Sequence, residues 1–341
     1  MQLDFLAVGD PVIDNFIRLK DARVHCNIND EDCEICMRWG DKIPYESSTE
    51  VAGVGNALNA AVSAAKLGLK SAVRAYVGED ENGEKCIKAL RDQGVDVSLI
   101  EKVPGKHTNY HFVLWYEDNR TILIKHETFD YTVPALAEAP KWLYLSSLGE
   151  NSLDYHKAWD EQLKSWPDTK LAFQPGTYQI KFSQAQDWWD DHLTDFEDLY
   201  KRADIFFCNK EEAARILKIQ GGAEIKTLLQ KIKEIGPKVV VITDDARGAY
   251  AIDEAGEMLH TPRYPDPRAP YEITGAGDAF ASTTTVALAL GKRLGEALQW
   301  GAINASAVLQ EIGAQKGLLS REQLEKNLAS PPGPFAVLPL S

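Results

Sequence analysis

Short apolar runs alternate along this chain with longer segments whose apolar residues recur at helical spacing. Six runs have the length and composition of buried strands: residues 3–9, 71–78, 141–149, 170–173, 204–209 and 238–243. Four segments have the spacing of amphipathic helices: residues 57–68, 83–94, 209–218 and 223–236. Strands covered on both faces are continuously apolar, and their alternation with helices is typical of parallel sheets. The sequence therefore predicts an α/β fold, a doubly wound, mostly parallel sheet flanked by helices.

Two regions interrupt this alternation. Residues 18–51 are polar, contain three cysteines and lack a helical period. Residues 108–128 have the pattern of a hairpin, NYHFVLWY and TILIKHET around a turn at EDNR. Together they predict a small β lid. We assign residues 1–330 to one α/β domain that carries these lid segments, and the proline-rich residues 331–341 to a loosely attached C-terminal tail.

Charge and composition narrow the possible partners. Asp and Glu number 51 against 37 Lys and Arg, which gives a formal net charge of −14. Nucleic acids and anionic membranes require clustered basic residues, so we expect neither as a partner. No apolar run approaches the ~20 residues of a transmembrane helix. Five cysteines, an odd number in a large chain without a signal peptide, favour a reducing compartment, and we expect a cytoplasmic protein.

An acidic chain that binds an anion needs a local anion-binding site, and YEITGAGDAF (residues 271–280) has the composition of such a site. Its glycines let the backbone approach a ligand closely, and the apolar sequence that follows predicts a buried helix. The N–H groups of Gly275, Ala276 and Gly277 at the start of that helix would hold a phosphate. Asp278 would then lie in the first turn, as a base for an attacking hydroxyl. An ordinary loop or N-cap aspartate is the alternative for this motif alone.

The order of motifs resembles that of the ribokinase-like, phosphofructokinase B-type carbohydrate kinases over residues 3–319. The resemblance is carried by GDPVID, VGNALNAAVSAAKLG, NKEEA, VVVITDDARGAY and YEITGAGDAF, in that order. It implies an ATP-dependent kinase that transfers the γ-phosphate of MgATP to a hydroxyl of a sugar or sugar derivative. Asp278 would be the base, and Gly275, Ala276 and Gly277 the anion hole. P-loop, Rossmann and zincin motifs do not occur in the sequence.

Further site residues follow from the matched positions and from the hairpin. The substrate side of the site is expected to contain Asp14, Gly55, Asn56, Asn59, Phe112 and Arg120. The nucleotide side is expected to contain Asn209, Glu212, Thr243, Gly248, Thr274 and Asn304. Asn209 and Glu212 would organise Mg²⁺ through water. In a strand His111 and Phe112 lie on opposite faces, so both cannot point inward, and Arg120 has a solvated turn as its alternative.

Three departures from the family pattern affect these assignments. Val54-Gly55 replaces paired glycines in the substrate loop, and Asp244-Asp245 replaces the usual Thr-x-Gly continuation in the nucleotide loop. Glu272-Ile273-Thr274 replaces an Asp-Thr-Thr pattern whose region binds a monovalent cation in some relatives, so such a cation is possible here. A nucleoside kinase of the same fold and a non-catalytic ligand-binding relative therefore stay open as alternatives.

The lid segments raise two further expectations. His25, Cys26, Cys33 and Cys36 have the chemistry of soft metal ligands, but their spacing suits one tetrahedral centre poorly. We expect free cysteines, with a metal site as the alternative. Exposed lid strands also invite pairing with a second copy, so a homodimer through the lid is possible.

Overall fold

The computed structural model describes residues 2–26, 33–117, 119–181, 189–219 and 222–340. Its main sheet has the order β16-β15-β14-β13-β12-β11-β10-β1-β6-β7. These strands are β1 Phe5–Val8, β6 Ser71–Gly78, β7 Ile100–Val103, β10 Trp142–Leu145, β11 Lys170–Phe173, β12 Ile205–Asn209, β13 Val240–Thr243, β14 Ala249–Ile252, β15 Met258–Thr261 and β16 Leu338–Pro339. Within this order the seven neighbouring strands β13, β12, β11, β10, β1, β6 and β7 pair parallel, and β14, β15 and β16 pair antiparallel.

The six strands predicted from apolar runs form the centre of this sheet, which confirms the expected doubly wound fold. All residues of β1, β6 and β10 are buried, because helices cover both faces. The helices are α1 Asn56–Lys66, α2 Glu81–Asp92, α3 Leu153–Lys164, α4 Thr177–Lys181, α5 Trp189–Arg202, α6 Lys210–Ile216, α7 Ile225–Ile235, α8 Ala276–Ala289, α9 Leu294–Val308 and α10 Arg321–Ala329.

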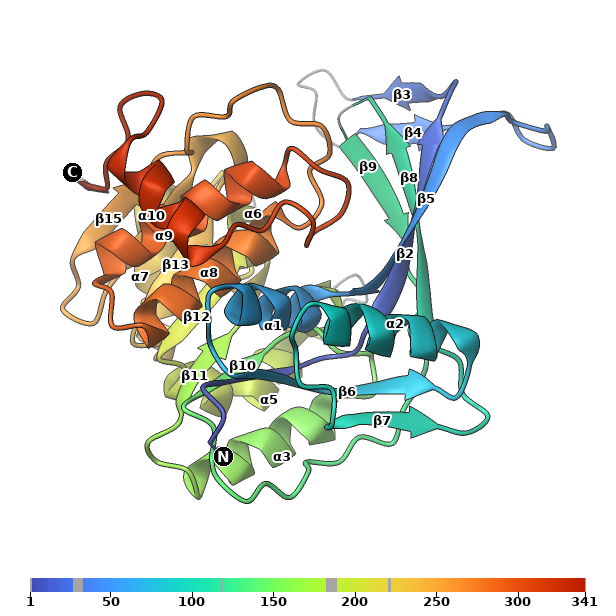
Figure 1. The fold of residues 1–341 in the computed structure, drawn as a ribbon. Helices are drawn as coiled ribbons and strands as arrows, with labels where there is room; N and C mark the ends of the chain where they lie inside the picture. The colour runs from blue at the N-terminus through green and yellow to red at the C-terminus, as the bar shows by residue number, and fades with distance from the viewer. Residues whose placement is uncertain (1, 27–32, 118, 182–188, 220–221, 341) are drawn as a thin grey trace.

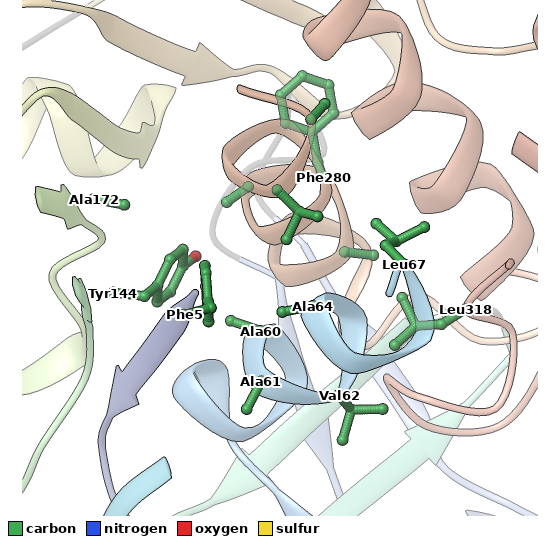
Figure 2. Close-up of a cluster of buried hydrophobic side chains, with 14 of the residues drawn as sticks. Phe5, Ala60, Ala61, Val62, Ala64, Leu67, Tyr144, Ala172, Phe280 and Leu318 are labelled. Carbon is green, nitrogen blue, oxygen red and sulfur yellow. The ribbon is translucent and has the colours of Figure 1, made fainter. Parts of the chain in front are cut away.

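Two apolar clusters lie on opposite faces of the sheet. One joins α1, α8, α9 and α10 to sheet residues such as Phe5 and Tyr144. The other joins α3, α5, α6 and α7 to sheet residues whose side chains point to the opposite face, such as Leu6 and Phe173. Figure 2 shows part of the first cluster, where α1 and α8 meet beside Phe5 of β1 and Tyr144 of β10. This packing fixes the start of α8, which carries the glycine motif, beside the start of α1.

The small lid is a second sheet of order β5-β2-β8-β9, which projects from the α/β layers in Figure 1. Its strands are β2 Val12–Leu19, β5 Tyr45–Val54, β8 Asn109–Tyr116 and β9 Asn119–Leu123. Strand β2 begins within GDPVID, so the lid starts earlier in the chain than expected. At the other end of the chain, the segment expected as a tail adds β16 to the edge of the main sheet, where Leu338 pairs with His260.

The expectation of free lid cysteines is wrong for two of the three. Cys26 and Cys33 form a disulfide, whereas Cys36 is free and exposed. The cause is the small hairpin of β3 Arg23–His25 and β4 Glu34–Cys36, whose antiparallel register places His25 opposite Glu34 and so brings the next residues together. The bond removes both thiols from the metal alternative. It also weakens the argument for a reducing compartment, because disulfides are rare in such compartments.

No helix in the described part of the chain combines the length and the apolar character needed to span a membrane.

Candidate active site

The carboxyl ends of the central parallel strands meet at one edge of the sheet, where open α/β sheets bind ligands. Gln174 follows β11 directly, Asn209 ends β12 and Thr243 ends β13. Asn209 and Thr243 are direct partners in the register of β12 and β13. This register brings two residues expected on the nucleotide side together, although 34 positions of sequence separate them.

The glycine motif forms the start of α8 at the same edge. Gly275 has φ 85°, in the left-handed region, and a Cβ built there would overlap Ala314, so no other residue fits without rearrangement. The helix begins at Ala276, and no side chain caps its N-terminus. The N–H groups of a first helical turn have no intrahelical acceptor and carry the positive end of the helix dipole. Since Gly277 is exposed and faces open space, an anion can approach these N–H groups.

Asp278 lies in this first turn and accepts three side-chain amide hydrogen bonds. Its Oδ1 accepts from Asn56 Nδ2 at 3.0 Å and from Gln174 Nε2 at 3.3 Å, and its Oδ2 accepts from Asn59 Nδ2 at 2.8 Å. Each carboxylate oxygen has two lone pairs. Oδ1 is therefore saturated, and Oδ2 retains one lone pair that can accept a hydrogen bond from a substrate hydroxyl.

The pKa of Asp278 reflects opposing influences. Burial raises it most, the hydrogen bonds from Asn59 and Gln174 lower it, the charge of Asp14 raises it and that of Arg120 lowers it, with a net increase. A raised pKa makes the carboxylate a better proton acceptor, while the amide donors still favour its charged form. This combination is what a general base requires.

A second layer of hydrogen bonds holds the amides on Asp278. Gln315 Nε2 donates to Asn59 Oδ1 at 3.0 Å and to the backbone oxygen of Gly53 at 2.8 Å. The Tyr144 hydroxyl donates to Gln174 Oε1. Because the amide oxygens of Asn59 and Gln174 are occupied, their amide nitrogens are directed at the carboxylate. Four elements of distant sequence thus fix the orientation of a single side chain.

On the substrate side, the structure separates two expected residues. Asp14 on β2 is buried, and its Oδ1 lies 3.4 Å from His111 Nδ1 of the neighbouring strand. Phe112 is on the opposite face of β8, is 42% exposed and packs on Tyr110. The alternation anticipated for this strand therefore holds, and it takes Phe112 away from the site. Gly55 precedes α1 with φ 119°, and the helix presents Asn56 and Asn59 to Asp278.

Arg120 is not a solvated turn residue. It lies in β9, opposite Trp115, and its Nε donates to Thr274 Oγ1 at 2.9 Å. Thr274 in turn donates from its hydroxyl and from its backbone N–H to Glu272 Oε1, at 2.6 and 2.8 Å. Since its charge lowers the pKa of Asp278, the arginine places a lid cation beside the glycine motif.

Asn209 and Glu212 use part of their polar surface on each other. The Glu212 backbone N–H donates to Asn209 Oδ1, and the Asn209 backbone N–H donates to Glu212 Oε2, both at 2.8 Å, as a capping box at the start of α6. The capping box leaves Glu212 Oε1 outside it. Burial raises the pKa of Glu212, and the charge of Asp278 raises it further, which places the two carboxylates near each other.

The two aspartates of the nucleotide loop have different environments. Asp244 is buried and accepts a bidentate ion pair from Arg247, at 2.7 and 2.9 Å, with Lys210 Nζ 3.6 Å away. Its charge is thereby neutralised within the protein. Asp245 is exposed and has φ 45°, a conformation that favours glycine. Gly248, expected on the nucleotide side, closes this loop, where its N–H donates to the Asp245 oxygen at 3.1 Å.

Asn304 does not reach the site surface. It is fully buried in α9, where Nδ2 donates to Thr283 Oγ1 at 2.7 Å and Oδ1 accepts from the Leu319 N–H at 2.9 Å. Both ends of its amide are used to join α9 to α8 and to the loop after α9. The structure therefore indicates a structural role for this residue instead of a nucleotide contact.

Sequence reasoning did not assign Gln174, Gln315 or His126 to the site. A signal existed for Gln174, because FQPGT directly follows an expected strand and so lies at the ligand-binding edge. Gln315 lies in a segment without secondary-structure periodicity, and His126 lies in the expected hairpin without a pattern that marks it, so only their contacts identify them.

Comparisons with known proteins show the family and the fold of the chain. The family model described as "pfkB family carbohydrate kinase" matches residues 24–321. A ribokinase of Bacillus subtilis is 26% identical over 81% of this chain and 87% of its own length. A bifunctional protein HldE of Trichlorobacter lovleyi is 26% identical over 81% of this chain, which spans 57% of that protein. Solved structures of similar fold include the Methanocaldococcus jannaschii nucleoside kinase (TM-score 0.76, 17% identity, 96% and 99% of the two chains) and an Arabidopsis thaliana ribokinase complexed with ribose and ATP (0.74, 20%, 96% and 99%). The chain belongs to the pfkB family of carbohydrate kinases, phosphotransferases that act on hydroxyl groups.

Proposed function

We propose that this protein transfers the γ-phosphate of ATP to a hydroxyl of a sugar or sugar derivative, with Asp278 as the general base. The observation that carries the proposal is the single remaining lone pair of Asp278 Oδ2, next to the uncapped start of α8. A substrate hydroxyl bound there would donate to Oδ2. The base would accept its proton as the oxygen attacks phosphorus.

The first-turn N–H groups of Gly275, Ala276 and Gly277 would hold the transferred phosphoryl group. They stabilise negative charge without bringing a counter-charge that would attract Asp278. Arg120, already beside Thr274, would supply a cation from the lid side. A lid in contact with the glycine motif would also exclude water, which would otherwise compete as the acceptor.

The nucleotide would lie along the ends of β12 and β13, near Thr243 and Gly248. Asn209 and Glu212 would organise Mg²⁺ through its waters, and the unshared Glu212 Oε1 fits the preference of that ion for oxygen ligands. When bound, Mg²⁺ would neutralise charge on the phosphates. Glu272 is fully buried with Oε2 unpaired, which supports a monovalent cation at that carboxylate.

A nucleoside kinase remains the second candidate, since a nucleoside kinase is among the proteins of similar fold.

We further propose a homodimer through the outer lid face, where exposed Phe112 is paired with exposed Leu123 across β8 and β9. Light scattering after size exclusion tests the dimer, and a mass equal to one chain would disprove it. The cytoplasmic location inferred from the sequence remains a prediction.

The test of the kinase proposal is Mg²⁺-dependent ADP release with pentoses, hexoses, sugar phosphates and nucleosides. Asp278→Asn should abolish release while the substrate still binds. Asp154→Asn is the matched control, because Asp154 also lies in a first helical turn, that of α3, but is exposed. ADP release by Asp278→Asn at the wild-type rate would exclude Asp278 as the base.

A further inference from the structure

Four polar atoms of the lid and its junction with the main domain are buried without hydrogen-bond partners. They are Asp14 Oδ1, Asn109 Nδ2, His111 Nε2 and His126 Nδ1. Asp14, Asn109 and His111 are 8%, 3% and 9% exposed, so solvent does not compensate them. We name these four residues the acceptor-end cluster. An unpaired buried polar group is destabilising, and native proteins contain few of them.

The strand register explains how the cluster assembles. Asp14 on β2 pairs directly with His111 on β8, and Asn109 lies two residues earlier on the same face. The Glu127 N–H donates to Asn109 Oδ1 at 2.7 Å, which ties the segment that contains His126 to the start of β8. The rings of His111 and His126 lie 5.2 Å apart, centre to centre. Four unpaired atoms are therefore gathered on one face of the lid.

The cluster lies on the acceptor side of the proposed base. Asp14 is close enough to Asp278 for its charge to raise the pKa of that carboxyl. Asp278, Asp14, His111 and His126 thus follow one another in a row. At its end the ring of His126 contacts the ring of Tyr178 edge-on, with the ring centres 5.1 Å apart. A substrate with one hydroxyl at Asp278 Oδ2 would extend along this row.

The chemistry of the cluster selects among substrates. Asp14 Oδ1 is an acceptor and Asn109 Nδ2 a donor, while each neutral imidazole nitrogen can be either. Burial, with the neighbouring His111, lowers the pKa of His126 to about 4, so this ring is uncharged near neutral pH. A hydroxyl both donates and accepts, and so it can pair with every atom of the cluster. A phosphate dianion only accepts and would be repelled by Asp14.

We propose that the acceptor-end cluster binds the hydroxyls of an uncharged polyol, so that the enzyme acts on a neutral sugar or nucleoside instead of an acceptor that already carries a phosphate. This inference rests on the proposed kinase function for the position of the reacting hydroxyl. His111 and His126 are its specificity-determining residues, and Asn109 adds a donor beside them.

Calorimetric binding to the full chain, without nucleotide, tests the proposal. The probes are D-ribose, D-fructose and adenosine, with ribose 1-phosphate, ribose 5-phosphate, fructose 6-phosphate and AMP as charged counterparts. We expect at least one neutral probe to bind, and its turnover, measured as kcat/KM, to exceed that of its phosphates on the order of 100-fold, because like charges repel strongly at this range.

His111→Phe and His126→Phe keep the aromatic rings and remove the unpaired nitrogens. We expect each to weaken binding of the neutral probe about 10-fold. His111→Phe also removes Nδ1, which lies 3.4 Å from the buried Asp14 Oδ1, so its thermal stability should fall. The thermal stability of His126→Phe should be equal to or higher than that of wild type, because an unpaired buried polar atom is lost. A purely structural role would instead lower it. His107→Phe is the matched control, since the His107 side chain is 83% exposed near the start of β8.

The outcomes separate the two proposals. Binding of a neutral probe that depends on both histidines, without ADP release, would refute the kinase function and keep the cluster. The cluster proposal is wrong if no neutral probe binds, if both phenylalanine variants bind like wild type, or if a phosphorylated acceptor has a higher kcat/KM than its neutral parent.

Discussion

Replacing Gln174 by leucine should move the acid limb of the pH–rate profile to higher pH. Gln174 Nε2 donates to Asp278 Oδ1 at 3.3 Å, and this bond lowers the pKa of the carboxyl against the effect of burial. Leucine is similar in volume but cannot donate. The charged form of Asp278 then loses one donor, while its protonated form loses little.

The size of the shift follows from the hydrogen-bond geometry. A hydrogen bond to a charged group contributes about 1.5–3 kcal/mol, and a 3.3 Å donor–acceptor distance argues for the lower value. About 1.4 kcal/mol corresponds to one pH unit, so we expect the acid limb to rise by about one unit. A base acts only when deprotonated, so activity falls on the acid side of this limb. Well above it, kcat/KM should recover towards the wild-type value.

The assay is initial-rate ADP release at subsaturating acceptor between pH 5 and 9, with ionic strength held constant. Gln162→Leu is the control, because Gln162 lies on α3, which packs against the opposite face of the sheet. A loss of activity that is equal at every pH would show that Gln174 only supports the fold. An unchanged acid limb with unchanged rates would show that it does not influence Asp278 at all.

Three further predictions concern stability and ion dependence. Asp278→Asn should raise the melting temperature at pH 7, because the raised pKa of the folded carboxyl means that the wild-type protein loses stability as this group ionises with increasing pH. The gain should vanish below about pH 4, where the aspartate is protonated in the unfolded chain as well, and a gain that persists there would contradict the reasoning. Asp245→Gly should stabilise the protein by up to about 1 kcal/mol in chemical denaturation, because φ 45° strains a residue with a side chain, and a destabilised variant would exclude strain at this turn. Potassium should activate ADP release relative to choline at equal ionic strength, and Glu272→Gln should remove that activation because the buried, unpaired carboxylate oxygen is lost. Equal wild-type rates in the two salts would refute a cation at Glu272.

Prediction from sequence succeeded for the secondary structure around the candidate site. Continuous apolar runs located the six central strands, and the periodic segments located α1, α2, α6 and α7. The glycine motif predicted a helix that begins with free N–H groups, and α8 begins at Ala276 with no side-chain cap. The residues that the resemblance placed at the site, such as Asp14 and Asn59, lie near Asp278.

Contacts across the fold were not predictable in the same way. Gln174 and Asn56 meet at Asp278 from 104 and 222 residues away, and no local pattern encodes such a distance. The register of β3 and β4 joined Cys26 to Cys33, against the expectation of free thiols. The resemblance placed Asn304 on the nucleotide side, but both ends of its amide are used inside the core.

The sequence by itself determined the strand and helix pattern, the parallel sheet and the glycine turn. These depend on apolar periodicity and on backbone freedom within a few residues. Only the tertiary structure decided which lid face carries His111 and which carries Phe112, and which lone pair of Asp278 remains open. Both depend on strand register and on packing between distant elements, because one face of a strand becomes interior only when another element covers it.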